Sequence, residues 1–210
     1  VAHELRSPLT KTHGYLEEIK EGRMEAKPRV IDSLYKNSEL LKKLVDDLHD
    51  LARAEAGKLD LEKQPILLRD IVKRAIESVR VKLEEKGIDL KVDPGEDALL
   101  DVDPDRVHQV FQNLIDNAVI HVEEGGHIRI TTELEDGYVR VSVSDDGEGI
   151  PEEKLLHIFE RLYRVDTSRS ESGSGLGLSI AKELVRAHEG EIWAESEEGK
   201  WTRISFSLPL

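Results

Sequence analysis

Cysteine is absent from this 210-residue sequence. Its absence excludes disulfides, thiolate metal sites and cysteine nucleophiles. No run of about 18 apolar residues occurs, so no segment of the sequence reads as a membrane span. Basic residues are in the minority, with 30 Lys+Arg against 44 Asp+Glu and a net charge of −14. Because an acidic surface repels nucleic acid and anionic lipid, we expect neither as a partner.

The negative charge is concentrated in the second part of the chain. Residues 1–57 carry 10 basic and 11 acidic side chains, whereas residues 58–210 carry 20 and 33. This difference favours two domains. The sequence starts with neither Met nor a helix cap, and its first residues read as helix interior. We therefore expect a fragment of a longer protein, whose upstream part could include a membrane anchor.

Residues 1–57 predict an antiparallel pair of helices. One apolar stripe contains Leu5, Leu9 and Leu16, and a second runs from Pro28 to a stop signal at Gly57. Two helices alone leave apolar flanks uncovered, so self-association into a four-helix bundle is the economical solution. A plain dimerisation coiled coil is the alternative that the periodicity leaves open.

Residues 58–210 alternate between helical and strand patterns. Helices combined with a mixed, mostly antiparallel sheet predict an α/β sandwich, joined to the hairpin by a linker or first strand over 58–65 and occupying 66–210. The expected helices are 66–86, 104–121, 152–159 and 176–188, and the expected strands are 58–63, 88–92, 98–102, 127–134, 138–144, 191–195 and 202–208.

Four short segments contain residues suited to chemistry. His3 and Glu4 begin the first helix, where a carboxylate that holds one imidazole N–H leaves the other nitrogen nucleophilic. Asn113 and Asn117 lie one helical turn apart and offer amide oxygens to a hard cation. The other two segments are an acidic turn with two glycines after a strand, 145–150, and a glycine-rich entry to a helix, 173–178, which suits a phosphate. Taken singly, each segment also fits a structure without a functional role: a solvated surface pair, an ordinary turn or a solvent-facing helix.

Together the motifs resemble a known family. His3-Glu4-x-x-Ser7-Pro8-Leu9-Thr10, Asn113-x-x-x-Asn117, Asp145-x-Gly147-x-Gly149, residues 159–166 and Gly173-x-Gly175-x-Gly177-Leu178 occur in this order. Their order and spacing resemble the cytoplasmic part of two-component sensor histidine kinases. The resemblance implies an α+β chain, in which a helical hairpin forms a dimeric four-helix bundle and is followed by an α/β sandwich of the Bergerat (GHKL) ATP-binding type.

The resemblance also implies roles for individual residues. His3 matches the phosphoacceptor and Glu4 the residue that activates it. Ser7 matches a position linked to dephosphorylation of the partner, and Arg164 an arginine directed at the terminal phosphate. Asn117 matches the Mg²⁺ ligand and Asp145 the carboxylate that accepts from the adenine amino group. The implied nucleotide site comprises Asn113, Asn117, His121, Asp145, Gly147, Gly149, Ile150, Phe159, Gly173, Gly175, Leu176, Gly177 and Leu178, with 166–174 as a lid.

Three positions depart from the family pattern. Ile120 stands where a basic residue is usual, with His121 following; Leu162 replaces a second aromatic; and Trp201 stands where glycine is typical. The loss of a phosphate-binding cation at position 120 would weaken ATP binding or shift that role to Arg164 and His121.

The implied function is Mg·ATP-dependent autophosphorylation of His3, followed by transfer to an aspartate on a response-regulator receiver domain that docks near residues 11–40, with phosphatase activity toward it as an addition. The implied partners are a second copy of the chain, through residues 1–57, and the receiver; the membrane is reached only through an upstream segment. We expect a cytoplasmic fragment of an inner- or plasma-membrane sensor. Two alternatives stay open: a degenerate ATP-binding dimerisation module, and another Bergerat-fold ATPase such as a chaperone or topoisomerase relative.

Overall fold

The computed structural model describes residues 2–55, 59–164 and 175–210, with the side chains of residues 2–4 and 55 outside the description. Its backbone contacts separate two compact units, residues up to 52 and residues from 53 onward, which are described one at a time. In the described ranges, no helix combines the length and hydropathy that crossing a bilayer requires.

The first unit is the predicted helical hairpin. Helix α1 spans Ala2–Lys20 and continues through Pro8. Helix α2 begins at Pro28, where a missing N–H costs nothing, and spans Pro28–Glu55. The turn between them closes with hydrogen bonds from Arg23 and Met24 N–H to the carbonyl oxygen of Glu18. The helical stripes of the sequence are therefore realised as two antiparallel helices.

The second unit contains a five-stranded sheet in the order β2-β4-β5-β7-β6. Strands β2 and β4 pair in parallel and the other neighbours are antiparallel, which confirms the expected mixed sheet. The β4–β5 hairpin turns at Gly137, whose φ is +84°. The strands are β2 (Asp89–Asp93), β4 (His127–Glu135), β5 (Tyr138–Asp145), β6 (Ile192–Glu197) and β7 (Trp201–Pro209).

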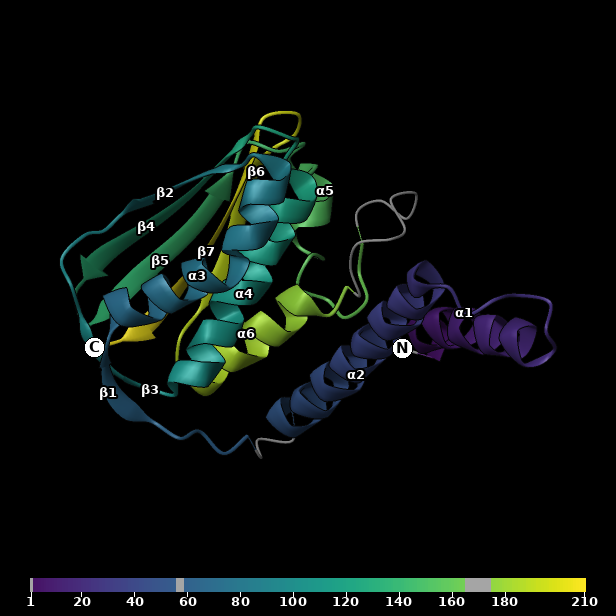
Figure 1. Ribbon diagram of the computed structural model, residues 1–210. Coiled ribbons are helices and arrows are strands. Elements are labelled where there is room, and N and C mark those ends of the chain that lie inside the picture. The colour runs from purple at the N-terminus through teal and green to yellow at the C-terminus, as the bar shows by residue number, and fades with distance from the viewer. Residues whose placement is uncertain (1, 56–58, 165–174) are drawn as a thin grey trace. The chain divides into compact units, whose positions relative to one another are not determined.

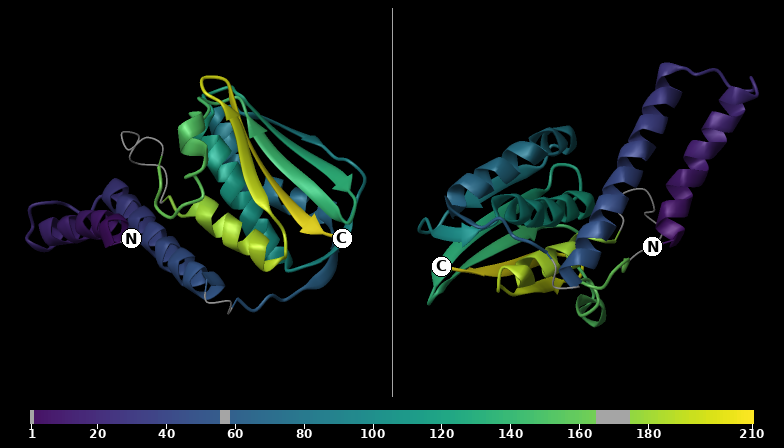
Figure 2. Two further views of the ribbon diagram at one scale, coloured as in Figure 1. Left: turned by 180° about the vertical axis from the view of Figure 1, so that it is seen from behind. Right: turned by 90° about the horizontal axis from the view of Figure 1, so that it is seen from below.

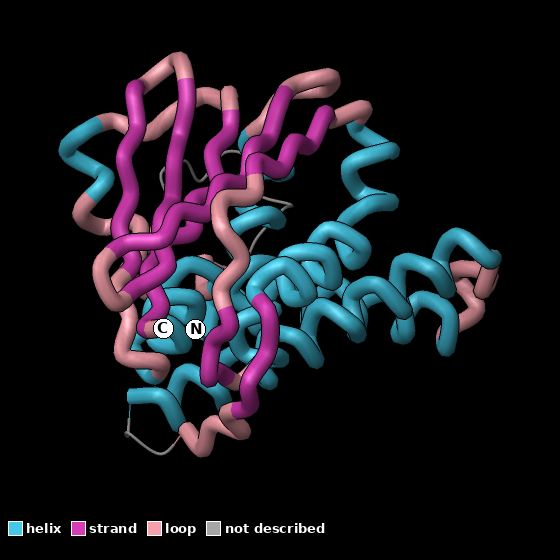
Figure 3. Tube along the Cα trace, turned by 90° about the vertical axis from the view of Figure 1, so that its left-hand side faces the viewer, coloured by secondary structure: helices cyan, strands magenta, loops and turns pink. Residues whose placement is uncertain are grey.

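Helices α3 (Leu68–Lys86), α4 (Pro104–His121) and α6 (Gly177–Ala187) cover one face of this sheet (Figure 1). The view from behind shows the other face of the sheet (Figure 2), and colouring by secondary structure separates strand and helix layers (Figure 3). Alternate residues of the strands point toward the helices and form the core. Phe111 of α4 and Phe206 of β7 meet there edge to face, with ring centroids 5.4 Å apart.

The ends of α3 and α4 follow local capping rules. The side chain of Asp103 accepts hydrogen bonds from the N–H groups of Asp105 and Arg106, and Pro104 follows at the first helical position. Helix α3 ends at Gly87, whose φ of +63° is the left-handed conformation that glycine adopts easily. Both sequence-based boundaries, 104–121 and the stop at residue 87, are confirmed.

Three sequence-based predictions are wrong: the strand before residue 64, the start of the next helix and the end of the helix that begins at residue 152. Residues 59–63 form no strand; the strand is β1 (Gln64–Leu67), which contains Pro65 and pairs antiparallel with β3 (Leu99–Val102). Because Ile66 and Leu67 are used in this ladder, α3 begins two residues later than expected. The helix predicted over 152–159 is only α5 (Glu152–Leu155); after it the N–H groups of His157 and Glu160 donate to carbonyls three residues earlier, so tighter turns replace the expected helix.

Candidate functional site

Asp145 is a buried carboxyl at the end of a core strand. It continues the alternation of Val139, Val141 and Val143, which all face the helices, and is only 7% exposed. Its Oδ1 accepts a hydrogen bond of 3.0 Å from the Gly147 N–H. Burial raises the pKa of Asp145 to about 6, although the Gly147 N–H and the nearby His121 act in the opposite direction. The group is therefore a directional acceptor that titrates close to neutral pH.

The loop after Asp145 lies directly against the last turn of α4. A Cβ on Gly147 would come within 2.6 Å of the His121 carbonyl oxygen and 2.8 Å of Asp145 Oδ1. No side chain fits there, so glycine is required by close approach. The same loop is joined to α4 by a second contact, 2.9 Å between His121 Nδ1 and Glu148 Oε1.

The far side of this loop is held by the β6–β7 turn. Gly149 has a φ of +66°, and a Cβ on it would lie 2.2 Å from the Glu197 carbonyl oxygen. The Gly199 N–H donates to the Glu148 carbonyl at 2.7 Å, and the Ile150 N–H donates to Ser196 Oγ at 2.8 Å. The 145–150 loop is thus fixed between the end of α4 and the β6–β7 turn, and its glycines leave its backbone open to close approach by a ligand.

Asp146 contrasts with Asp145 although the two are adjacent. Its carboxylate accepts from the His127 N–H at 2.7 Å and lies 2.8 Å from His127 Nδ1. These hydrogen bonds from His127 lower the pKa of Asp146, against an opposing effect of burial, so it stays ionised where Asp145 takes up a proton. The Asp146 carboxylate thus ties the loop to the start of β4, whereas the adjacent Asp145 carboxyl is buried beneath the loop.

Asn113 of α4 faces the start of α6. Its side chain is 9% exposed, and its Nδ2 has no hydrogen-bond partner. A Cβ on Gly177, the first residue of α6, would lie 3.5 Å from Asn113 Oδ1. The N-cap residue Leu176 gives α6 no side-chain cap, so the first N–H groups of the helix are not capped from that position. A buried amide donor and a helix N-terminus therefore converge, which suits an anionic ligand.

Two segments of the predicted nucleotide site meet beside α6. The Leu162 N–H donates to the Gly175 carbonyl at 2.9 Å. Both residues have positive φ, 59° and 67°, and a Cβ on Gly175 would lie 2.9 Å from Leu162 Cα. Phe159 and Arg164 are half-buried on the first segment. On the second, Leu176 is buried and Leu178 is half-buried; Gly173 lies outside the described residues.

The remaining predicted residues occupy two places. Asn117 is half-buried on α4, one turn after Asn113. His3 and Glu4 lie on α1, with side chains outside the description, and Ser7 is exposed one turn later. The structure thus brings residues of α4, the 145–150 loop and the start of α6 together in one unit, and carries the His3 motif on the other.

Several residues that shape this site escaped sequence reasoning. Ser196 and Glu197 hold the glycine loop, and Gly199 supplies the positive φ of the turn before Trp201. Only the glycine at position 199, between two predicted strands, signalled that turn.

Two domain families match the chain. Residues 102–210 match the histidine kinase-, DNA gyrase B- and HSP90-like ATPases, and residues 1–57 match the His Kinase A (phospho-acceptor) domain. The whole chain aligns with sensor histidine kinase WalK of Bacillus subtilis at 37% identity, covering 35% of that protein. It aligns with signal transduction histidine-protein kinase BaeS of Escherichia coli at 34% identity, covering 45% of that protein. The chain therefore spans less than half the length of these two relatives.

Solved structures give the same assignment. Histidine kinase AdeS of Acinetobacter baumannii superimposes with a TM-score of 0.85 at 25% identity, over 99% of this chain and 97% of that one. Histidine kinase ThkA, in its complex with response regulator protein TrrA, superimposes with a TM-score of 0.78 at 28% identity, over 100% of this chain and 59% of that one. The chain belongs to the sensor histidine kinases of two-component systems, with a His Kinase A domain followed by an ATP-binding domain of the histidine kinase-, DNA gyrase B- and HSP90-like family.

Proposed function

We propose that this chain transfers the γ-phosphoryl group of Mg·ATP to His3 and then to an aspartate of a response-regulator receiver domain. The observation that supports this most directly is that one unit contains both the buried acceptor Asp145 and, beside the start of α6, the Asn113 Nδ2 without a hydrogen-bond partner. One end suits a base with an amino group and the other suits phosphates. We assign residues 1–57 to dimerisation and phosphoacceptance, 58–65 to the linker and 66–210 to ATP binding.

In this proposal the nucleotide lies along α4. Ionised Asp145 accepts a hydrogen bond from the adenine amino group, and Gly147 and Gly149 leave room for the ring beside Ile150. Asn113 and the first N–H groups of α6 face the phosphates, where glycines at 173, 175 and 177 permit close approach. His121, Phe159, Leu176 and Leu178 complete the walls.

Mg²⁺ fits the donors that α4 offers. In the described ranges, no group of three His, Asp or Glu side chains could hold a resident metal ion. Mg²⁺ keeps several waters and is carried by substrate phosphates, so one protein oxygen is enough, and the half-buried Asn117 amide would supply it. The bound ion would neutralise phosphate charge in a domain that is itself acidic.

The chemical step joins a His3 ring nitrogen to the γ-phosphorus while the bond from that phosphorus to the β–γ bridging oxygen breaks, and ADP leaves. Glu4 holds the other ring nitrogen and stabilises the imidazolium that develops, then accepts its proton. Arg164 stabilises the charge on the transferred group. Positioning and electrostatics are the main contributions of the protein to such a transfer.

The hairpin is proposed to dimerise and to receive the regulator. Apolar side chains on it are left exposed, including Leu9 at 57%, Tyr35 at 65% and Val45 at 56%. A second copy would cover such positions in a four-helix bundle. The superimposed ThkA structure is a complex with the regulator TrrA, which supports docking of a receiver on this chain. We place that docking near residues 11–40 of the hairpin.

The test is the intact mass of the chain after incubation with Mg·ATP, with acid and base treatment of the product. We expect a gain of one phosphoryl group that is lost in acid, stable in base and absent from His3→Gln, which still binds ATP. Incorporation that persists in His3→Gln would overturn the assignment of the acceptor. ATP binding without incorporation, also after about 15 native upstream residues are added to extend α1, would favour the degenerate module.

A further inference from the structure

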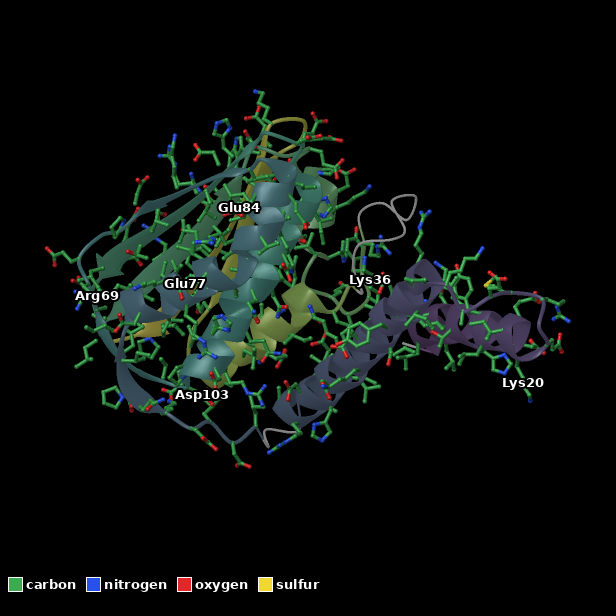
Figure 4. All side chains as sticks on the ribbon, in the orientation of Figure 1. Lys20, Lys36, Arg69, Glu77, Glu84 and Asp103 are labelled. Atoms are coloured by element: carbon green, nitrogen blue, oxygen red, sulfur yellow. The ribbon has the colours of Figure 1, made fainter. Side chains whose placement is uncertain are left out.

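Helices α3 and α4 run side by side in the same direction. Arg74 Nη1 lies 2.6 Å from Asp105 Oδ1 in the first half of each helix, and Lys82 Nζ lies 2.5 Å from Asp116 Oδ1 further toward their C-terminal ends. Figure 4 labels Asp103 at the start of α4 and Glu84 toward the end of α3. The C-terminal ends of the two helices meet, because Lys86 of α3 contacts the carbonyls of Val119 and Val122 at the end of α4.

Lys86 makes the last contact in this series, and it differs in kind. Its Nζ donates to the carbonyl oxygens of Val119 at 2.6 Å and Val122 at 3.0 Å, and its side chain is half-buried. These carbonyls belong to the end of α4, where no following turn supplies N–H donors. The Lys86 carbonyl in turn accepts from the Gly125 N–H at 3.0 Å. One lysine therefore fastens both the final turn of α4 and the loop after it.

The fastened segment supports both ends of the candidate site. Asn117 and His121 stand on this last part of α4, and Gly147 packs on the His121 carbonyl. The loop continues to Gly126, where a Cβ would meet Asp146 Oδ1 at 2.8 Å. A displacement of the α4 end would therefore move the Asn117 amide and the loop of Asp145 together.

The charge of Lys86 has a second effect. The C-terminal end of a helix carries partial negative charge, which repels an anionic ligand bound nearby. Ile120, in the same turn, contributes no cation. The ammonium group of Lys86, on the neighbouring helix α3, contacts these carbonyls. It therefore offsets the partial negative charge at the C-terminal end of α4.

We propose that Lys86 is a positioning residue for ATP, which acts through the C-terminal turn of α4 and not by contact with the nucleotide. This inference rests on the proposed function, because it assumes that ATP occupies the site of Asn117 and Asp145. Lys82 provides a matched control, since it joins the same two helices one turn earlier through an ion pair whose lysine side chain is 54% exposed.

The test compares Lys86→Met, Lys86→Arg and Lys82→Met in the full chain, by titration with a fluorescent ATP analogue and by thermal unfolding. We expect the Kd of Lys86→Met to rise about tenfold, because a charge-assisted pair of hydrogen bonds is lost from the site's support. Lys86→Arg, which restores cationic donors, should recover most of that loss. Lys82→Met should stay within about twofold of wild type, as an exposed pair contributes little.

Equal Kd values for Lys86→Met and Lys82→Met, measured below both melting temperatures, would overturn the proposal, as would failure of Lys86→Arg to recover affinity. If Lys86→Met does not fold, Lys86→Gln replaces it with the same expectations. Wild-type chain that binds ATP but gains no phosphoryl group would count against the kinase function alone. Wild-type chain that binds no ATP would overturn both.

Discussion

The backbone N–H of Asp103 donates a hydrogen bond of 3.1 Å to Nε2 of His188, between residues 85 positions apart in sequence. Because Nε2 accepts, the proton of the neutral ring is on Nδ1, which lies 2.8 Å from the Leu184 carbonyl oxygen. Asp103 Oδ2 also accepts from the Glu62 N–H at 3.0 Å. This pair thus joins the start of α4, the end of α6 and the segment before β1.

His188 should make the chain sensitive to acid. Burial lowers the pKa of His188 below its ordinary value of 6.5. Below pH 6.5 the unfolded chain binds a proton at His188 that the folded chain does not bind. The free energy of unfolding therefore decreases as pH falls below 6.5. His188→Gln should cost about 2 kcal/mol at pH 8, because buried partners lose their hydrogen bonds, and less at pH 5.5. Urea unfolding at the two pH values measures the difference.

His157→Gln is the control for this prediction, because the His157 side chain is 49% exposed and its contacts with Glu160 and the Tyr163 ring are local. Its unfolding free energy should change little at either pH. A cost of His188→Gln that is the same at pH 8 and pH 5.5 would contradict the role given to the neutral ring.

The sequence predicted the elements better than the contacts that join them. Helix 104–121 could be read from Asp103, Pro104 and its apolar period, because capping and amphipathicity are local. Strand β1 could not, since Gln64–Leu67 pairs with residues 99–102 and is defined by that partner, with Pro65 tolerated in a strand at a sheet edge. Local pattern therefore fails where a short strand depends on a distant one.

The candidate site shows the same division. Asp145, Gly147 and Gly149 could be predicted because they form a contiguous sequence motif, and the structure places them in one fixed loop. Lys86 could not, because its partners are the backbone carbonyls of Val119 and Val122, which carry no residue-specific signal. Contacts between a side chain and the backbone of a residue distant in sequence can be recognised only once the fold is known.

Glu189 offers a stabilising substitution. It follows α6 with a φ of +62°, a conformation that costs a residue with a side chain about 1 kcal/mol. Its side chain is 80% exposed, and its ion pair with Lys63 is long, at 3.7 Å. Glu189→Gly should raise the unfolding free energy by up to about 1 kcal/mol, as glycine adopts this helix-ending conformation without strain. Glu189→Ala removes the same charge but keeps the strain, so it should give no gain. Equal effects of the two substitutions in urea unfolding would exclude the backbone explanation.

Asp145 should make ATP affinity fall with decreasing pH at a higher pH than an exposed carboxylate would. Its pKa of about 6 means that the free protein protonates this acceptor just below neutrality. Since the adenine amino group needs the ionised form, Kd should rise about tenfold for each pH unit below 6. For stability the sign reverses: the buried carboxylate costs free energy above pH 6, and protonation relieves that cost as pH falls.

Asp145→Asn isolates this effect. The amide keeps an acceptor oxygen but has no charge, so its ATP affinity should be lower than that of wild type at pH 8 and should converge with it by pH 5. Titrating both proteins across this range cancels the protonation of the nucleotide itself. A ratio of the two Kd values that is constant with pH would rule out Asp145 as the titrating acceptor.

The last prediction concerns two glycines in adjoining turns. Both Gly149 and Gly199 have positive φ, +66° and +77°, so alanine at either position incurs about 1 kcal/mol of backbone strain. They differ in the space around them, because a Cβ on Gly149 would lie 2.2 Å from the Glu197 carbonyl oxygen, whereas a Cβ on Gly199 would meet nothing within 4 Å.

Gly149→Ala must therefore push the glycine loop away from the β6–β7 turn and move the residues next to Asp145. We expect it to weaken ATP binding more than about tenfold and to destabilise the chain by about 3 kcal/mol, as overpacking does. Gly199→Ala should lose only the strain energy and keep ATP affinity within about twofold. Parallel urea unfolding and nucleotide titration of the two variants check this, and equal losses of affinity would show that φ, not contact with Glu197, fixes the loop.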